Sequence, residues 1–505
     1  MTAIDPGRTV AVVGTGTMGQ GIAQVALAAG HLVRLYDAVP GRAEEAARAI
    51  AARLGRLVDK GRLDAAGRDA ALARLRPAAR LAELADSALV IEAILEQLDV
   101  KQKLFGELEP VVSEDCLLAT NTSSLPVTAV AGALRRPGRF VGLHFFNPAP
   151  LLPLVEVVRG FATDEADLER ARATVAAWGK TPVTCADTPG FIVNRIARPF
   201  YAEAFRVYEE RGADPATIDA VLRECGGFAM GPFELTDLIG QDVNNSVTRS
   251  VYEAFFHDPK FTPSFAQGQL VQAGLLGRKT GRGWFDHGEG AVRPEPSTAE
   301  PCDPPAEISW HAKAPGVCAP LHEMIEEAGV KVVRDRTPQS EWYIGLPDGA
   351  MLTLTGGEAA TPQCGGTYIY FDLALDYRSC TRVALAPSEK ASAADVRAAV
   401  GLFQALGKKV SVVGDVPGLI VARTVAMLVD FAEDAAGRGV ADREDVDTAM
   451  RLGVNYPRGP LEWGEEIGLS RVRNILWGLS QDYPGGRYEP SLSLRRRAAV
   501  RESLL

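Results

Sequence analysis

Three glycines and one carboxylate near the amino terminus have the spacing of a phosphate-binding turn. Gly14, Gly16 and Gly19 follow the apolar run Val10–Val13, and a helix-like stretch and a second apolar run then lead to Asp37. Gly14 permits a tight turn, Gly16 lets the backbone approach a pyrophosphate, and Gly19 lets the helix pack closely on the strand. Asp37 would accept hydrogen bonds from both hydroxyls of an adenosine ribose and would repel a 2′-phosphate. The pattern therefore predicts a dinucleotide site that takes NAD rather than NADP.

A histidine and a glutamate further along the chain are candidates for acid–base chemistry. His144 stands at the end of an apolar run in LHFFNPAP, and Glu156 lies inside the apolar run LVEVV. An unpaired carboxylate in such a run would cost several kcal/mol, so Glu156 needs a partner. The proline-rich turn at 147–150 can fold the second run back beside the first and bring the carboxylate to the imidazole. Such a pair fixes the tautomer of the ring and makes it a general base, whereas an isolated histidine would be read as a hydrogen-bonded core residue.

Alternating strand and helix patterns must position these residues. Residues 1–186 are predicted to form a Rossmann-like, doubly wound α/β domain, because apolar runs alternate with helical stretches. Residues 187–286 are predicted to form an all-helical domain, and 287–305, rich in Pro, Gly and Glu, a linker. The runs expected to be strands are Val10–Val13, Leu32–Tyr36, Ala88–Ala93, Leu117–Ala119, Phe140–Phe146 and Leu154–Val158.

The helical domain occurs twice. DTPGFIVNRI at Asp187 recurs as DVPGLIVART at Asp415, and GPFELTDLIG at Gly231 recurs as GPLEWGEEIG at Gly459, both 228 positions later. Residues 415–505 are thus a second all-helical domain, and 306–414 a truncated, degenerate α/β segment without the glycine motif. We expect the second helical domain to pack on the first in place of a partner subunit.

The second copy acts as an internal control, because packing residues should persist where catalytic ones are free to change. At the same offset His144 becomes Asp372, Glu156 becomes Ala384 and Asn194 becomes Ala422, whereas the Pro-Gly, Gly-Pro and apolar positions survive. The comparison singles out three polar residues of the first copy.

Composition narrows the class of protein. The 505 residues carry a formal charge of −10, which disfavours general nucleic-acid binding, and seven scattered cysteines without a Cys-x-x-Cys pair argue against disulfides and a metal site. No apolar run reaches membrane-spanning length, and the first residues lack a signal pattern. We expect a cytoplasmic enzyme that contacts neither membrane nor nucleic acid and is a monomer or a homodimer.

Seven segments together resemble the L-3-hydroxyacyl-CoA dehydrogenase family over residues 8–286. They are GTGTMGQGIA, EAILEQLDVK, NTSSL, LHFFNP, LVEV, DTPGFIVNR and GRKTGRGWFD. The duplicated helical domain with a degenerate middle resembles the long bacterial members that act on 3-hydroxybutyryl-CoA, or on 3-hydroxyadipyl-CoA in phenylacetate breakdown.

The resemblance implies NAD-dependent oxidation of an L-3-hydroxyacyl-CoA to the 3-ketoacyl-CoA, in fatty acid or phenylacetate catabolism. It makes His144 the base that removes the hydroxyl proton and Glu156 the group that stabilises the imidazolium, with Ser123 and Asn194 bonded to substrate oxygens. The cofactor would contact Gly14, Gly16, Thr17, Met18, Gly19, Asp37, Glu96, Lys101, Ser123 and Asn147. The phosphates of coenzyme A would meet basic residues of a helical insertion, namely Arg53, Arg56, Lys60 and Arg62.

Two alternatives stay open at this stage. One is a β-hydroxyacid dehydrogenase acting on free acids, which would use a lysine on the helix joining the domains; the nearest lysine here is Lys180. The other is an acyl-CoA- or nucleotide-binding protein without turnover.

Overall fold

The computed structural model describes residues 2–335 and 342–502. It divides into two compact units. The first comprises the chain up to Arg195 together with Arg438–Val454, and the second comprises Ile196–Gly437 and the chain from Asn455 onward.

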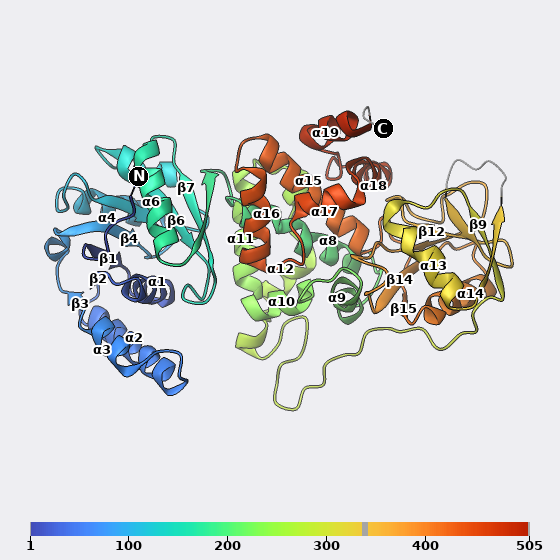
Figure 1. Cartoon of the computed structure of the whole chain (residues 1–505), viewed down its shortest axis with the longest axis horizontal. Coiled ribbons are helices and arrows are strands. Elements are labelled where there is room, and N and C mark those ends of the chain that lie inside the picture. Colours follow the sequence, from blue (N-terminus) through green and yellow to red (C-terminus); the bar gives the residue numbers. More distant parts are fainter. Residues whose placement is uncertain (1, 336–341, 503–505) are drawn as a thin grey trace. The chain divides into compact units, whose positions relative to one another are not determined.

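The first unit is built on an eight-stranded sheet with the order β3-β2-β1-β4-β5-β6-β7-β8 (Figure 1). Every neighbouring pair is parallel except β6 and β7, which are antiparallel. The strands are β1 (Thr9–Val13), β2 (Leu32–Tyr36), β3 (Leu75–Ala78), β4 (Ser87–Glu92), β5 (Leu117–Thr120), β6 (Phe140–Phe145), β7 (Leu154–Arg159) and β8 (Thr181–Ala186).

The central strands of this sheet are apolar and fully buried because helices connect them across the two faces. Helices α2 and α3 instead form a hairpin that projects from the unit (Figure 1). The helices are α1 (Thr17–Ala28), α2 (Arg42–Asp59), α3 (Ala65–Leu72), α4 (Leu98–Leu108), α5 (Val127–Ala131), α6 (Glu165–Ala177) and α7 (Val193–Ile196).

One helix of the second repeat belongs to the first unit. Helix α16 (Arg443–Val454) packs on β7 and β8, and the Asp445 carboxylate accepts a 2.9 Å hydrogen bond from the backbone N–H of Thr184. Its counterpart 228 residues earlier, α9 (Pro215–Glu224), packs on β14 (Arg382–Pro387) within the second unit. Each repeat therefore covers the sheet of the other with this helix, and residues 438–454 belong to the same compact unit as residues 1–195.

The second unit contains a seven-stranded mixed sheet with the order β10-β9-β11-β12-β13-β14-β15. Its strands are β9 (Glu307–His311), β10 (Lys331–Asp335), β11 (Tyr343–Gly345), β12 (Met351–Leu354), β13 (Tyr368–Phe371), β14 and β15 (Lys409–Val412). Its helices are α8 (Arg198–Glu209), α9, α10 (Pro232–Ile239), α11 (Gln241–Ala254), α12 (Phe265–Gln272), α13 (Ala319–Glu327), α14 (Ala393–Ala405), α15 (Val421–Gly437), α17 (Pro460–Ile467), α18 (Leu469–Asp482) and α19 (Leu492–Glu502).

The two repeats agree element by element. Subtracting 228 from the bounds of α14, α17 and α18 gives the bounds of α6, α10 and α11, and β13, β14 and β15 begin at the counterparts of the first residues of β6, β7 and β8. The second α/β segment differs in its middle, where a short turn joins β11 to β12 at the place where the first sheet has helix α4. In the described part of the chain, no helix is long and apolar enough to cross a membrane.

Helix α15 of the second repeat packs on α8 of the first, as expected from the duplication, and a buried ion cluster joins them. The fully buried Glu203 carboxylate accepts hydrogen bonds from Arg423 at 2.7 Å, Arg487 at 2.6 Å and the Tyr488 hydroxyl at 2.7 Å. Burial by itself would raise the pKa of Glu203, but Arg487 and Arg423 outweigh it and lower the pKa to about 2. The carboxylate is thus charged and holds two buried guanidinium groups.

We expect Glu203→Gln to lower the free energy of unfolding by about 3 kcal/mol near neutral pH, because the buried Arg487 loses its carboxylate partner and the buried Arg423 keeps only Glu210. The folded-state pKa lies below the ordinary value of 4.5, so this stability is present above pH 4.5 and is lost as pH falls toward 2. Urea unfolding of both proteins at several pH values checks this. Parallel curves of stability against pH would contradict the assignment.

Candidate active site

The glycine turn has the geometry that a pyrophosphate requires. Gly14 has φ +94°, and a Cβ there would lie 2.5 Å from the carbonyl oxygen of Ala93. A Cβ at Gly19 would overlap the carbonyl oxygen of Gly14, whereas at Gly16 nothing lies within 4 Å. Helix α1 begins at the exposed Thr17, without a side-chain cap and without an acidic residue in its first turn. Gly14 and Gly19 thus meet steric needs of the fold, and Gly16 leaves the helix N-terminus open to an anion.

Asp37 follows β2 directly and is tied to the same turn. Its Oδ2 accepts hydrogen bonds from the backbone N–H of Thr15 at 3.0 Å and from the Thr15 hydroxyl at 2.6 Å. Its Oδ1 accepts one from the N–H of Val39 at 3.0 Å. Burial would raise the pKa of Asp37, but the hydrogen bonds from Thr15 and Val39 outweigh it and the pKa is lowered. A charged carboxylate beside the turn fits the ribose of NAD and opposes a 2′-phosphate.

His144 and Glu156 face each other across the antiparallel pair β6 and β7. They are register partners, and the Nδ1 of His144 lies 2.6 Å from the Oε2 of Glu156. His144 is 6% exposed and Glu156 is fully buried. The predicted fold-back at residues 147–150 therefore brings the two side chains together.

The second oxygen of Glu156 stabilises the start of α7. Glu156 Oε1 accepts hydrogen bonds from the backbone N–H groups of Ile192 at 3.0 Å and Val193 at 2.9 Å. Three donors thus face this carboxylate, so we assign it as charged and the Nδ1 of His144 as the protonated ring nitrogen. The Nε2 of His144 has no hydrogen-bond partner among the described residues and keeps a free lone pair, and the ring lies 4.5 Å from that of Phe146.

Ser123 and Asn194 lie next to each other near this pair. The Asn194 amide nitrogen is 3.5 Å from the Ser123 carbonyl oxygen, and both side chains are half-buried. The Ser123 turn is held by Glu96, whose Oε1 accepts hydrogen bonds from the Thr122 hydroxyl at 2.6 Å and the Ser123 N–H at 2.9 Å. Burial would raise the pKa of Glu96, but nearby Lys101 and the bond from Thr122 lower it.

Lys101 is itself engaged in a buried ion pair. It is 1% exposed, and its ammonium lies 2.5 Å from Glu92 and 3.2 Å from Glu96. Glu92 is fully buried and also accepts a 2.7 Å hydrogen bond from the Thr120 hydroxyl. Lys101 is therefore held by two carboxylates, of which Glu96 was predicted and Glu92 was not.

The remaining predicted residues are accessible. Asn147 is exposed two residues after the end of β6, and Met18 is half-buried in the first turn of α1. A contact of Asn121 was not predicted either. Its Oδ1 accepts a 2.9 Å hydrogen bond from the Phe145 N–H and so connects the Ser123 turn to the end of β6.

In the second repeat the same positions carry no histidine. Asp372 replaces His144, and its carboxylate accepts hydrogen bonds from the backbone N–H groups of Ile420, Val421 and Ala422 at 3.0, 2.7 and 2.9 Å. The carboxylate that stabilises the helix start has thus moved from the strand of Glu156 to the neighbouring strand, while Ala384 occupies the vacated position. The second repeat thus keeps a carboxylate that accepts the N–H groups of the helix start, but it has no imidazole at this place.

Comparison with known proteins agrees with this description. Residues 9–188 match the profile "3-hydroxyacyl-CoA dehydrogenase, NAD binding domain". Residues 190–287 and again 418–502 match "3-hydroxyacyl-CoA dehydrogenase, C-terminal domain", which confirms the duplication. Residues 352–417 match "3-hydroxybutyryl-CoA dehydrogenase reduced Rossmann-fold domain", which fits the truncated segment.

Relatives include proteins of the same length and shorter ones. The chain is 42% identical to 3-hydroxyadipyl-CoA dehydrogenase of Escherichia coli over 98% of both chains. A crystal structure of 3-hydroxybutyryl-CoA dehydrogenase from Escherichia coli K12 matches with a TM-score of 0.89 and 41% identity over 99% of both chains. A probable 3-hydroxybutyryl-CoA dehydrogenase of Deinococcus radiodurans is 40% identical over 55% of this chain and 99% of its own length. The chain therefore belongs to the 3-hydroxyacyl-CoA dehydrogenase family and is an oxidoreductase that uses NAD.

Proposed function

We propose that the protein oxidises the 3-hydroxyl group of an L-3-hydroxyacyl-CoA to the ketone, with the His144–Glu156 pair as general base. The observation that carries this is the 2.6 Å contact between His144 Nδ1 and Glu156 Oε2, which leaves Nε2 as the proton acceptor. NAD, when bound, accepts the hydride that C3 of the substrate gives up. His144 Nε2 takes the hydroxyl proton as the carbonyl forms, and Glu156 stabilises the resulting imidazolium.

The neighbouring polar groups suit the same reaction. The amide of Asn194 and the hydroxyl of Ser123 are the groups that we propose to hydrogen-bond the substrate oxygens. The ring of Phe146 lies beside that of His144. Glu96 keeps the Ser123 turn in position, and Lys101 supports Glu96.

Coenzyme A would be met by the projecting α2–α3 hairpin. Arg56, Lys60 and Arg62 are exposed there and form no ion pair within the described residues. Arg53, in contrast, is hydrogen-bonded to the side chain of Gln20, and burial lowers its pKa. We therefore propose the three free cations, rather than Arg53, as the contacts for the coenzyme A phosphates.

The alternative of a β-hydroxyacid dehydrogenase acting on free acids requires a lysine as base, and the contacts of Lys180 do not support that role. The Nζ of Lys180 donates to the backbone carbonyls of Ala149 at 2.6 Å and Leu152 at 2.8 Å. An ammonium held by two loop carbonyls acts as a structural brace. The thioester substrate is the better proposal, with a 3-hydroxyadipyl or 3-hydroxybutyryl acyl group, after which the two Escherichia coli relatives are named.

An absorbance assay of NADH formation tests the proposal. Reduction of NAD should be saturable with L-3-hydroxybutyryl-CoA or L-3-hydroxyadipyl-CoA, and negligible with the corresponding free acids. Comparison of the two thioesters assigns the acyl preference. Turnover of the free acids at the rate of the thioesters would contradict the proposed substrate class.

A second assay concerns the choice of cofactor. Asp37→Ala is expected to raise the KM for NAD by about 10-fold or more, because the ribose hydroxyls lose their charged acceptor, and to narrow the preference for NAD over NADP. Steady-state kinetics with both cofactors measures this. Asp5→Ala, which removes an exposed carboxylate of the same unit, serves as the control and should leave both KM values unchanged. An unaltered preference in Asp37→Ala would remove Asp37 from cofactor recognition.

A further inference from the structure

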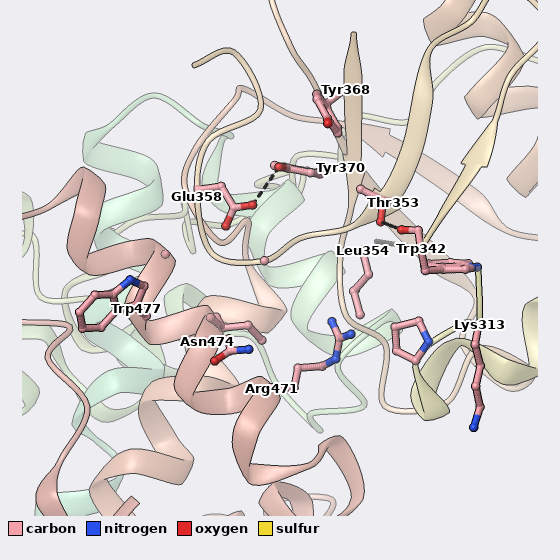
Figure 2. A pocket seen from close by; sticks show the side chains of 14 residues that line it. Lys313, Trp342, Thr353, Leu354, Glu358, Tyr368, Tyr370, Arg471, Asn474 and Trp477 are labelled. Atoms are coloured by element: carbon pink, nitrogen blue, oxygen red, sulfur yellow. Dashed lines mark hydrogen bonds between the residues drawn. The ribbon is translucent and has the colours of Figure 1, made fainter. Parts of the chain in front are cut away.

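The second unit contains a cavity on the face of its truncated sheet. In the first unit, Phe140 of β6 packs against Phe105 of α4, with ring centroids 4.7 Å apart. Tyr368 has the same place on β13, but the described residues of the second segment include no helix at the position of α4. The sheet face around Tyr368 and Tyr370 instead borders a cavity of about 650 Å³, closed on its other side by α18 (Figure 2). This volume suits a small organic ligand.

An uncompensated cation lies in this cavity. Arg471, in the first turn of α18, is half-buried and its side chain points toward Leu354 (Figure 2). Its guanidinium forms no hydrogen bond or ion pair with the described residues. Burial lowers the pKa of Arg471, and the groups that partly offset this are the thiol of Cys318 and the phenol of Tyr377, not a carboxylate. A desolvated guanidinium without a counter-charge lowers the stability of the fold. The presence of Arg471 here therefore calls for an explanation other than stability.

Two further donors line the same cavity without an acceptor. Trp342 is 7% exposed, and its indole Nε1–H has no hydrogen-bond partner among the residues that the structure describes. Lys313 is exposed and, within the same residues, forms no ion pair. The one carboxylate of the lining, Glu358, accepts a 3.0 Å hydrogen bond from the Tyr370 hydroxyl. The lining thus carries two cations against one carboxylate, and the Trp342 indole is a buried donor without an acceptor, although buried donors in proteins are almost always satisfied.

The cation belongs to the second repeat alone. The residue 228 positions before Arg471 is Val243, so the same helix position in the first repeat is apolar. The apolar part of the cavity is formed by Leu354, Ile475 and the exposed ring of Trp477. A ligand that matches this lining carries an oxyanion for Arg471 and an apolar or aromatic body for the side chains around it.

We infer that this cavity is a binding site for a small organic anion, a carboxylate or phosphate ester with an apolar body, and that Arg471 is its principal anchor. The site lies within the second unit and is separate from the His144–Glu156 pair. Loss of the covering helix during divergence of the second repeat has left a ligand cavity rather than a second dehydrogenase site.

Titration of the full-length protein, followed by tryptophan fluorescence, tests the inference. The probes are adipate as a carboxylate, hexyl phosphate as a phosphate ester with an apolar body, and inorganic phosphate as an anion without one. We expect a saturable change in emission with adipate or hexyl phosphate, because Trp342 and Trp477 line the cavity, and the probe that responds identifies the class of anion. Arg471→Val, which restores the residue of the first repeat, should raise that Kd at least 10-fold without lowering the urea midpoint.

The matched control is Arg496→Val, which removes an exposed arginine of α19 and should leave the Kd unchanged. Both variants should retain the rate of NADH formation. Trp477→Phe should diminish the emission change, which places the bound probe beside α18. The inference is overturned if none of the probes gives a saturable signal, if inorganic phosphate alone gives one, or if Arg471→Val binds as well as wild type. A lower urea midpoint for Arg471→Val would overturn the role of Arg471 as a ligand anchor and assign it to the fold.

Discussion

His144→Gln is expected to lower the turnover of 3-hydroxyacyl-CoA oxidation by about 10²–10⁴-fold while NAD binding persists. Glutamine can still hydrogen-bond to Glu156, but its amide cannot accept a proton from the substrate hydroxyl. The glycine turn and Asp37 are on other elements and should be unaffected. Initial rates of NADH formation give the turnover, and calorimetric titration gives the affinity for NAD.

The pH profile separates a lost base from a distorted site. Oxidation releases a proton that the wild-type protein passes to His144, so its rate should rise with pH, and this dependence should disappear in His144→Gln. His257→Gln, which removes an exposed histidine from the second unit, is the control and should keep the wild-type profile. Full activity of His144→Gln would remove this histidine from the mechanism.

The central strands were predictable because they are the most apolar segments of the chain. All six apolar runs correspond to strands, within one residue at either end. The two strands that were missed, β3 and β8, are the edges of the sheet. An edge strand has one neighbour and tolerates polar residues and proline, as Pro77 and Thr184 illustrate, so its apolar signal is weak.

The exchange of helices between the repeats could not be predicted. The 228-residue offset identifies α9 and α16 as counterparts, and their apolar faces show that each must pack on something. Periodicity does not tell which of two similar sheets receives which helix, because both sheets present the same kind of surface. The structure resolves this by placing α16 with β7 and β8.

The candidate site could be predicted where a charged residue stands within an apolar stretch of the sequence. Glu156 was singled out because a carboxylate in an apolar run requires a partner, and that reasoning led to His144. The same signal was present in SALVIEAI, where Glu92 ends a buried strand, and following it would have led to Lys101. Hydrogen bonds from the backbone, such as the one from the Phe145 N–H to Asn121, cannot be predicted in this way because they do not depend on an unusual residue type.

Glu156→Ala is expected to lower the free energy of unfolding by about 3–5 kcal/mol, since two buried N–H groups each lose their acceptor at about 1–3 kcal/mol. The groups are those of Ile192 and Val193 at the start of α7. Turnover should fall by at least about 10²-fold, because the imidazolium loses its counter-charge. Glu156→Gln keeps an acceptor oxygen for the two N–H groups, so it should lose activity with a smaller loss of stability.

The second repeat shows how the stability can be recovered without the chemistry. There, Asp372 accepts the N–H groups of the helix start from the strand position of His144, and Ala384 stands where Glu156 would be. The double variant His144→Asp, Glu156→Ala copies this arrangement into the first repeat. We expect it to regain about 2 kcal/mol relative to Glu156→Ala, since the introduced carboxylate satisfies the same donors, and to remain inactive. Urea unfolding and NADH formation, measured on the wild type and the variants, distinguish the two functions of Glu156. If the double variant were no more stable than Glu156→Ala, the carboxylate would not be interchangeable between the two strands, and the second repeat would require a different structural explanation.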